Sequence, residues 1–189
     1  GYDHHFGKNR SANITDLKAF ADLYDFKVEE ISAQDLKDVT VSSTKIRTAL
    51  NQGEVDLANS YLGYNFFITG TVVKGKGLGR TIDFPTANIN IIATYKLIPS
   101  DGVYVVRSVI EGKTVFGMMN IGTNPTVDGK KRSIEVYFFN FKSDIYDAEL
   151  KIEFLKRLRS EQKFENLEAL KMQLKKDMTN ASSYLKNLK

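Results

Sequence analysis

The chain has 189 residues, of which 42% are hydrophobic and 26% charged, and its formal net charge is +4. This composition is ordinary for a globular protein, and so mild a charge does not by itself distinguish a phosphate-bearing small ligand from nucleic acid. The absence of cysteine excludes disulfides and thiolate metal sites. With no visible signal peptide and no apolar run of about 20 residues, the sequence predicts a cytoplasmic protein without membrane contact.

Residues 1–63 predict an α/β segment. The expected elements are a helix capped by Thr15 or Asp16, a strand over 26–31, a helix from Ser42 or Ser43 to Leu50, and a helix from Val55 to Leu62 that stops at Gly63. One strand cannot form a sheet, so we expect this segment to be an incomplete piece of a domain. Its helices would then expose their apolar stripes and be poorly packed.

From Tyr64 onward the pattern becomes that of β-strands. Strands are expected over 66–73, 102–110, 113–120, 133–141 and 149–158, with a hairpin turn at Glu111-Gly112. Closely spaced strands with glycine turns favour a small closed antiparallel barrel. A helix capped by Asn166 should follow and run to Lys176, and Asp177 or Thr179 should begin a last helix.

The segment 75–88 carries the strongest chemical signal. Its glycines Gly75, Gly77 and Gly79 allow close approach to a ligand, and Lys76 and Arg80 add positive charge. Thr86 and Asn88 are two residues apart, so in an extended segment both side chains face one side. Two neutral oxygens beside a phosphate-covering loop are suited to a magnesium ion in phosphoryl transfer.

Five motifs in order resemble the kinase domain of the bacterial bifunctional riboflavin kinase/FAD synthetase family. They are the segment 75–88, Asp101-Gly102-Val103-Tyr104, the segment 120–126, Ser133-Ile134-Glu135-Val136-Tyr137 and the segment 158–164. The resemblance covers residues 64–189 and implies a six-stranded antiparallel Greek-key barrel with C-terminal helices. It also implies that the chain makes FMN from riboflavin, with ATP as phosphate donor and Mg²⁺ as cofactor.

The resemblance assigns a role to each candidate residue. Glu135 would be the catalytic base for the riboflavin 5′-hydroxyl, and Thr86 and Asn88 would hold the metal. The residues expected to bind ATP are Gly75, Lys76, Gly77, Gly79, Arg80, Phe138, Asn140 and Tyr146. Those expected to bind the flavin are Arg159, Gln162 and Phe164. The match departs at Asp83, where the family usually has glycine. A carboxylate beside a phosphate is unfavourable unless it points away or helps to hold the metal.

The first 63 residues resemble the end of the same family's FMN adenylyltransferase domain. Gly1 to Arg10 matches a Gly-x-Asp-x-x-Phe-Gly-x-x-Arg element, and Ser42, Ser43 and Arg47 match a phosphate-binding Ser-Ser-Thr-x-x-Arg element. The family's His-x-Gly-His motif is absent, so we expect no adenylyl transfer by this chain. His4 and His5 lack a third ligand at metal-binding spacing and are not expected to hold a metal.

Each of these residues also has a structural interpretation. Thr86 and Asn88 could form turn hydrogen bonds, Glu135 could face solvent, Phe138 could pack in the barrel, and Ser43 could merely cap a helix. Two other functions therefore stay open: a flavin or nucleotide sensor without catalysis, and a nucleic-acid-binding barrel. The second is disfavoured because the aromatic run 137–141 contains no basic residue.

Overall fold

The structure is a computed structural model that describes residues 5–30, 35–36, 39–75, 77–93, 95–126 and 129–188. The chain divides into two compact units, Gly1–Ser42 and Ser43–Lys189. The boundary predicted from the resemblance lies between residues 63 and 64. It separates two family domains and not these two compact units, and it stays a prediction.

The first unit contains little regular structure. Its elements are η1 (Lys8–Arg10), α1 (Ile14–Tyr24), and the paired short strands β1 (Asp35–Leu36) and β2 (Val39–Thr40). Asn13, and not Thr15 or Asp16, caps α1, because its side chain accepts a hydrogen bond from Thr15 N while the Asp16 carboxylate accepts one from Asn13 N. Residues 26–30 form no strand, so the strand expected there is wrong over its described part.

Much of the apolar face of α1 is exposed, although Ala21 within it is buried. Phe20 is 45% exposed, Leu23 70% and Tyr24 68%. Exposed apolar surface on this scale gives the helix little tertiary stabilisation.

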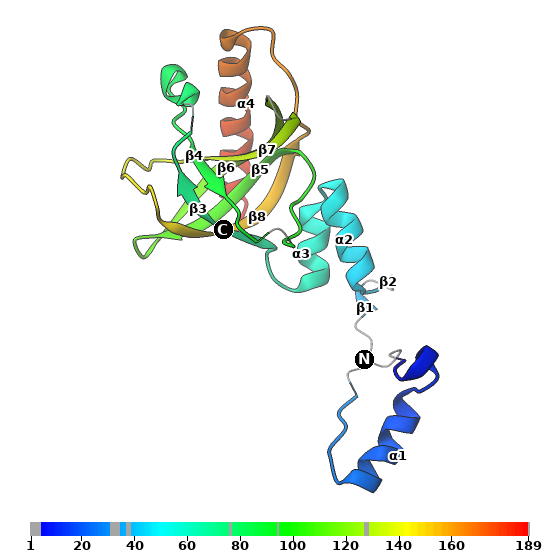
Figure 1. The fold of residues 1–189 in the computed structure, drawn as a ribbon. Coiled ribbons are helices and arrows are strands. Elements are labelled where there is room, and N and C mark those ends of the chain that lie inside the picture. The colour runs from blue at the N-terminus through cyan, green and yellow to red at the C-terminus, as the bar shows by residue number, and fades with distance from the viewer. Residues whose placement is uncertain are drawn as a thin grey trace. The chain divides into compact units, whose positions relative to one another are not determined.

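The second unit is built on a closed barrel (Figure 1). Its elements are α2 (Ser43–Gln52), α3 (Val55–Leu62), β3 (Phe67–Val73), η2 (Leu78–Ile82), β4 (Ala87–Asn90), β5 (Gly102–Ile110), β6 (Lys113–Thr126), β7 (Gly129–Phe138), β8 (Glu149–Arg159) and α4 (Leu167–Lys186). All neighbouring strands are antiparallel, in the order β3-β4-β7-β6-β5-β8. The predicted six-stranded Greek-key barrel is therefore confirmed.

The barrel interior is filled by alternate side chains of its strands. Along β3, buried and half-buried residues alternate, as a two-residue repeat requires. Tyr104 and Phe154 are both 0% exposed, and their rings meet edge to face with centroids 5.3 Å apart. Met119, Ile121, Val136 and Ile152 belong to the same buried cluster.

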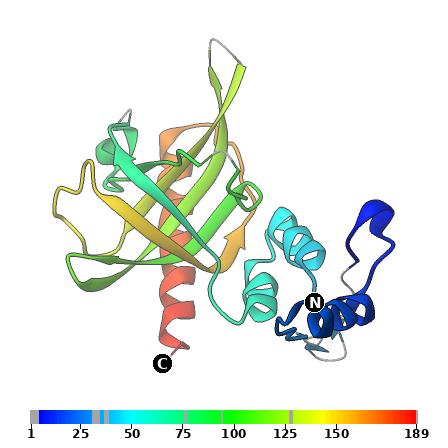
Figure 2. The same ribbon diagram turned by 60° about the horizontal axis from the view of Figure 1, so that its bottom comes forward.

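Helices α2 and α3 pack beside the barrel (Figure 2), so the expected poor packing of 1–63 is wrong for residues 43–63. Leu50 is 1% exposed, and Val55 and Ala58 are 0% exposed. Asn59 joins α3 to the barrel: its Nδ2 donates to Phe154 O at 2.8 Å, and its Oδ1 accepts from Phe66 N at 2.7 Å. The barrel therefore covers the apolar faces of α2 and α3, for which the sequence indicated no packing partner.

Helix α4 runs along the outside of the barrel as one continuous helix (Figure 1), so the predicted break at Asp177 or Thr179 is wrong. Asn166 is its N-cap, as expected, with Oδ1 accepting from Ala169 N at 2.9 Å. Ala181, with 0% exposure, Leu174 and Met178 pack in the cluster that covers the outer barrel surface. None of the helices in the described ranges has the length and apolar character to cross a membrane.

Candidate active site at the glycine loop

The centre of the candidate site is a hydrogen bond between residues far apart in the sequence. Thr86 Oγ1 donates to Glu135 Oε2 at 2.9 Å, and both residues are half-buried. The pairing of β4 with β7 sets this contact, because Asn88 lies opposite Glu135 in the register. The residues predicted as metal ligands and as catalytic base therefore lie together.

The glycine loop lies against these residues. A Cβ on Gly75 would lie 2.0 Å from Asn88 Nδ2, and a Cβ on Gly79 would lie 2.2 Å from Phe84 O and 3.5 Å from Thr86 Oγ1. Gly77 has a left-handed φ of 72°. The predicted loop residue Lys76 lies outside the described residues. A side chain at 79 would therefore displace the backbone, and one at 75 would displace the Asn88 side chain.

Replacing Gly79 by alanine should damage catalysis more than folding. The new Cβ would overlap the Phe84 carbonyl and push the backbone before Thr86 out of place. A shift of this size near reacting groups costs about 100-fold in kcat/KM. Steady-state assay of the FMN formation that the resemblance implies would measure it. Gly112→Ala is the control for an effect on folding alone, since Gly112 has a left-handed φ of 74° that strains alanine but has open space around it. Equal losses in both variants would contradict the prediction.

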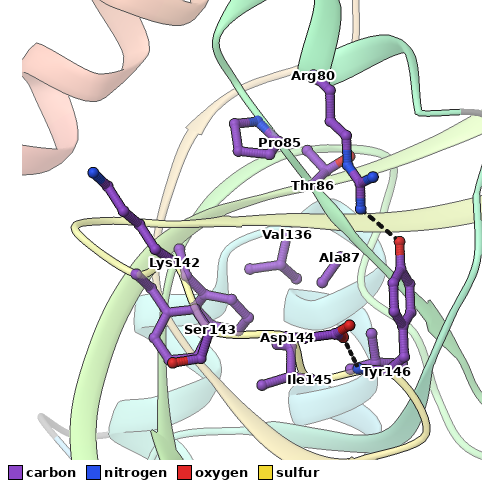
Figure 3. Close-up of a pocket in the computed structure, with 13 residues that line it drawn as sticks. Arg80, Pro85, Thr86, Ala87, Val136, Lys142, Ser143, Asp144, Ile145 and Tyr146 are labelled. Atoms are coloured by element: carbon purple, nitrogen blue, oxygen red, sulfur yellow. Dashed lines mark hydrogen bonds between the residues drawn. The ribbon is translucent and has the colours of Figure 1, made fainter.

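A cavity of about 320 Å³ opens beside Thr86 (Figure 3). Three of the residues expected to bind ATP line it: Arg80, Phe138 and Tyr146. Arg80 Nη2 donates to Tyr146 Oη at 2.7 Å, so the two side chains bridge one edge of the cavity. Lys142, Ser143 and Asp144 also line it and were not predicted from the sequence. No motif singles them out, because an irregular loop after β7 carries them.

Asn140 does not join the other expected ATP residues. It has a left-handed φ of 54° and lines a different hollow, together with Phe116, Phe139 and Met178. Its conformation and place make it a turn residue at the end of β7. Asn140 is thus outside the cavity that Arg80 and Tyr146 enclose.

Asp83 points away from the cavity side of the loop. Its φ is 65°, a conformation that glycine adopts more easily. Its Oδ2 accepts a hydrogen bond from Lys171 Nζ of α4 at 2.7 Å. That hydrogen bond, and then the charge of Lys171, lower the pKa of Asp83 below its ordinary 3.8. The carboxylate thus ties the loop to α4, where it is paired with a cation.

Breaking this pair should loosen the loop. We expect Asp83→Asn and Lys171→Met each to raise the KM for ATP, the phosphate donor that the resemblance implies, about 3-fold at low salt, with no further rise in the double variant. In about 1 M salt the difference from wild type should vanish.

A lowered pKa of Asp83 means that the pair persists above pH 3.8 and is lost only as the pH falls through the lowered value. The ratio of KM values should therefore stay constant between about pH 6 and 8, and a change across that range would contradict the assignment.

Two of the three residues expected at the flavin form a cluster at the end of β8. The Arg159 guanidinium carbon lies 5.7 Å from the centre of the Phe164 ring. Arg159 Nε and Nη2 both donate to Asp177 Oδ2, at 2.9 and 2.8 Å. Gln162 is exposed in the irregular segment between Arg159 and Phe164. Asp177 was not predicted from the sequence as a site residue. The signal that could have found it is its position in the apolar stripe of α4, where a charged side chain needs a buried partner.

The Arg159 segment lies beside the strand pair that carries Glu135. Asn120 pairs with Glu135 across β6 and β7. A Cβ on Gly122 would lie 2.0 Å from Glu161 Oε1 and 3.2 Å from Asn120 Nδ2. Glu161, in the segment after β8, therefore lies close to Gly122 of β6. Gly122 is two residues after Asn120, the cross-strand partner of Glu135.

The Ser-Ser-Thr-x-x-Arg element, predicted to bind phosphate, is divided between the two compact units. Ser43 begins α2, and Arg47 Nη1 donates to Ser43 Oγ at 3.3 Å, while Ser42 ends the first unit. His4 lies outside the described residues. Over the described ranges, no cluster of three His, Cys, Asp or Glu residues could hold a metal ion.

Comparison with known proteins identifies the family. The model of the riboflavin kinase (flavokinase) family matches residues 62–185, so the chain belongs to this family. The chain is 41% identical over 197 residues to the bifunctional riboflavin kinase/FMN adenylyltransferase of Bacillus subtilis. It is also 41% identical over 189 residues to the protein so named in Listeria monocytogenes. Both alignments cover 100% of this chain and 60% of the relative, so the chain spans about three fifths of their length.

A solved structure shares the fold of nearly the whole chain. It is described as a macrolide-efflux protein from Streptococcus pneumoniae, with a TM-score of 0.86 and 35% identity. The match covers 96% of this chain and 58% of that one.

Proposed function

We propose that this chain transfers the γ-phosphate of ATP to the 5′-hydroxyl of riboflavin, which gives FMN and ADP. The observation that carries the proposal is the 2.9 Å hydrogen bond between Thr86 and Glu135, with Gly79 packed beside Thr86. A carboxylate, a hydroxyl and a glycine loop at one point supply a base, a metal ligand and a phosphate cover.

Glu135 would act as the general base. It accepts the proton of the 5′-hydroxyl while that oxygen attacks the γ-phosphorus, and the bond from the γ-phosphorus to the bridging oxygen breaks to release ADP. Thr86, by donating to one carboxylate oxygen, fixes the orientation of the other. No covalent intermediate with the protein is needed.

The family implies ATP and a divalent metal ion, and we propose Mg²⁺ for this chain. Thr86 and Asn88 fit it, because Mg²⁺ takes few protein ligands and completes its shell with phosphate and water oxygens. The Asn88 side chain occupies the space that a Cβ on Gly75 would take, so this proposed ligand lies next to the loop that we assign to the phosphates. When bound, the metal would neutralise the charge of the phosphates.

The two substrates would occupy different sides of the Thr86–Glu135 pair. Arg80, Phe138 and Tyr146 surround the cavity that we assign to the nucleotide. Gly75, Gly77, Gly79 and Lys76 would cover its phosphates. Arg159, Gln162 and Phe164 would contact the flavin, since a guanidinium and an aromatic ring both suit a flat ring system.

Adenylyl transfer is not proposed for this chain alone. Ser42, Ser43 and Arg47 match one element of that activity, but the sequence contains no His-x-Gly-His motif. We infer that FAD is formed only by a protein that also carries that motif.

The test is incubation of the chain with riboflavin, ATP and Mg²⁺, followed by chromatographic separation of the flavins. FMN without FAD is the expected product. Riboflavin binding without FMN would favour a flavin sensor. Formation of FAD would show a complete second site and contradict the assignment of the 1–63 segment.

A further inference from the structure

The middle of α4 holds a carboxylate that the proposed reaction does not use. Asp177 is 1% exposed. Among the buried residues of the described part of the chain, it is the one that carries a charge. A buried carboxylate destabilises the fold unless it is paired and hydrogen-bonded. Its partners therefore indicate why the chain keeps it.

Three donors surround the Asp177 carboxylate. Arg159 Nε lies 3.1 Å from Oδ1 and 2.9 Å from Oδ2, and Arg159 Nη2 lies 2.8 Å from Oδ2. Gln173 Nε2, one turn earlier on α4, donates to Oδ1 at 2.8 Å. Both carboxylate oxygens are thus satisfied, and two donors of the guanidinium fork fix the plane of Arg159.

The remaining contacts of Arg159 lie in the segment after β8. Its Nη1 donates to Ser160 O at 3.0 Å, and its guanidinium lies beside the Phe164 ring. Residues 160–164 form neither helix nor strand, so this segment depends on side chains for its position. Asp177 is the buried anchor of that arrangement, and the Arg159 charge is compensated before any ligand arrives.

We propose that Asp177 is a positioning residue for riboflavin, acting through Arg159. It holds the guanidinium plane and the Phe164 ring as one rigid wall against the isoalloxazine ring. A charge-compensated guanidinium suits an uncharged ring better than it suits the phosphates of ATP. The inference rests on the proposed function, because it assigns the wall to the flavin of that reaction.

The first variant is Asp177→Asn, which keeps the shape and removes the charge. We expect the KM and the Kd for riboflavin to rise about 10-fold, because the fork no longer fixes Arg159. The KM for ATP should stay within about 2-fold, because the nucleotide residues lie elsewhere. Riboflavin fluorescence gives the Kd directly, without turnover. Asp56→Asn is the matched control, because Asp56 pairs with Lys156 at 2.7 Å at the surface. It should change neither constant.

A second variant separates positioning from stability. Arg159→Met with Asp177→Leu replaces the buried pair by apolar side chains of similar volume, a change that often preserves or raises stability. We expect wild-type thermal stability or better, with riboflavin binding still weakened about 10-fold. Comparison with Arg159→Met alone decides the case if Asp177→Asn fails to fold, because a residue that acts only through Arg159 adds no further loss of riboflavin binding once Arg159 is gone. Gln173→Met should weaken riboflavin binding by a smaller factor in the same direction.

Riboflavin binding that recovers together with stability in the double variant would overturn the proposal and leave Asp177 a structural residue. Equal changes in the KM for riboflavin and ATP would do the same. These outcomes differ from failure of the proposed function, in which the wild-type chain itself makes no FMN.

Discussion

Glu135→Gln should lower the rate of FMN formation by about 10²- to 10⁴-fold, the contribution of a general base. The amide of glutamine matches the carboxylate in size, so its oxygen can still accept the 2.9 Å hydrogen bond from Thr86. It cannot accept the proton of the riboflavin hydroxyl. Riboflavin and ATP should therefore bind with nearly unchanged Kd, while kcat falls.

The measurement is single-turnover FMN formation, with riboflavin binding measured separately by fluorescence. Glu149→Gln is the matched control, because Glu149 is an exposed glutamate on strand β8 of the same barrel. Its rate should equal that of the wild type. If Glu135→Gln retains more than about a tenth of the wild-type rate, the base is another group and the mechanism given above is wrong.

Phe154→Ala should lower the free energy of unfolding by about 3–5 kcal/mol, the usual cost of removing a buried aromatic ring. Phe154 is 0% exposed, and its ring packs against Tyr104 at 5.3 Å and Phe66 at 5.9 Å between centroids. Its carbonyl also accepts a hydrogen bond from Asn59. The resulting cavity would lie where the barrel meets α3, so it cannot collapse without disturbing both.

Urea denaturation at equilibrium, followed by far-UV circular dichroism, would measure the change. Tyr95→Ala removes a ring that is 89% exposed and should alter stability by no more than about 0.5 kcal/mol. A loss below about 1 kcal/mol in Phe154→Ala would mean that this ring is not part of the core.

Local patterns predicted several elements well. The helix over 55–62 and the strand over 102–110 have the predicted bounds, because a glycine with a left-handed φ ends the first and a hairpin turn ends the second. The cap at Asn166 was predicted from an asparagine before an apolar periodic run. Signals of this kind depend on a few neighbouring residues, which the sequence supplies.

The errors arose where distant contacts decide the outcome. Asp177 and Thr179 resembled a helix start, yet α4 continues through both, and Asp177 pairs with Arg159 of β8 instead of capping a helix. The apolar stripes of α2 and α3 seemed uncovered, yet Leu50 and Val55 join the barrel cluster. In each case a partner far along the chain compensates the feature that looked unfavourable.

By itself, the sequence indicated the barrel class, the glycine loop and the Thr86–Asn88 pair, because turn residues and strand alternation are local properties, while Glu135 became a candidate only through the resemblance to a family. Only the tertiary structure decided which of them meet. Thr86 and Glu135 are 49 positions apart, and their contact depends on the register of β4 against β7. It likewise placed Asn140 outside the cavity, Asp83 against Lys171, and Asp177 beneath Arg159. Strand register and helix docking are set by burial of the whole core, and no short segment carries that information.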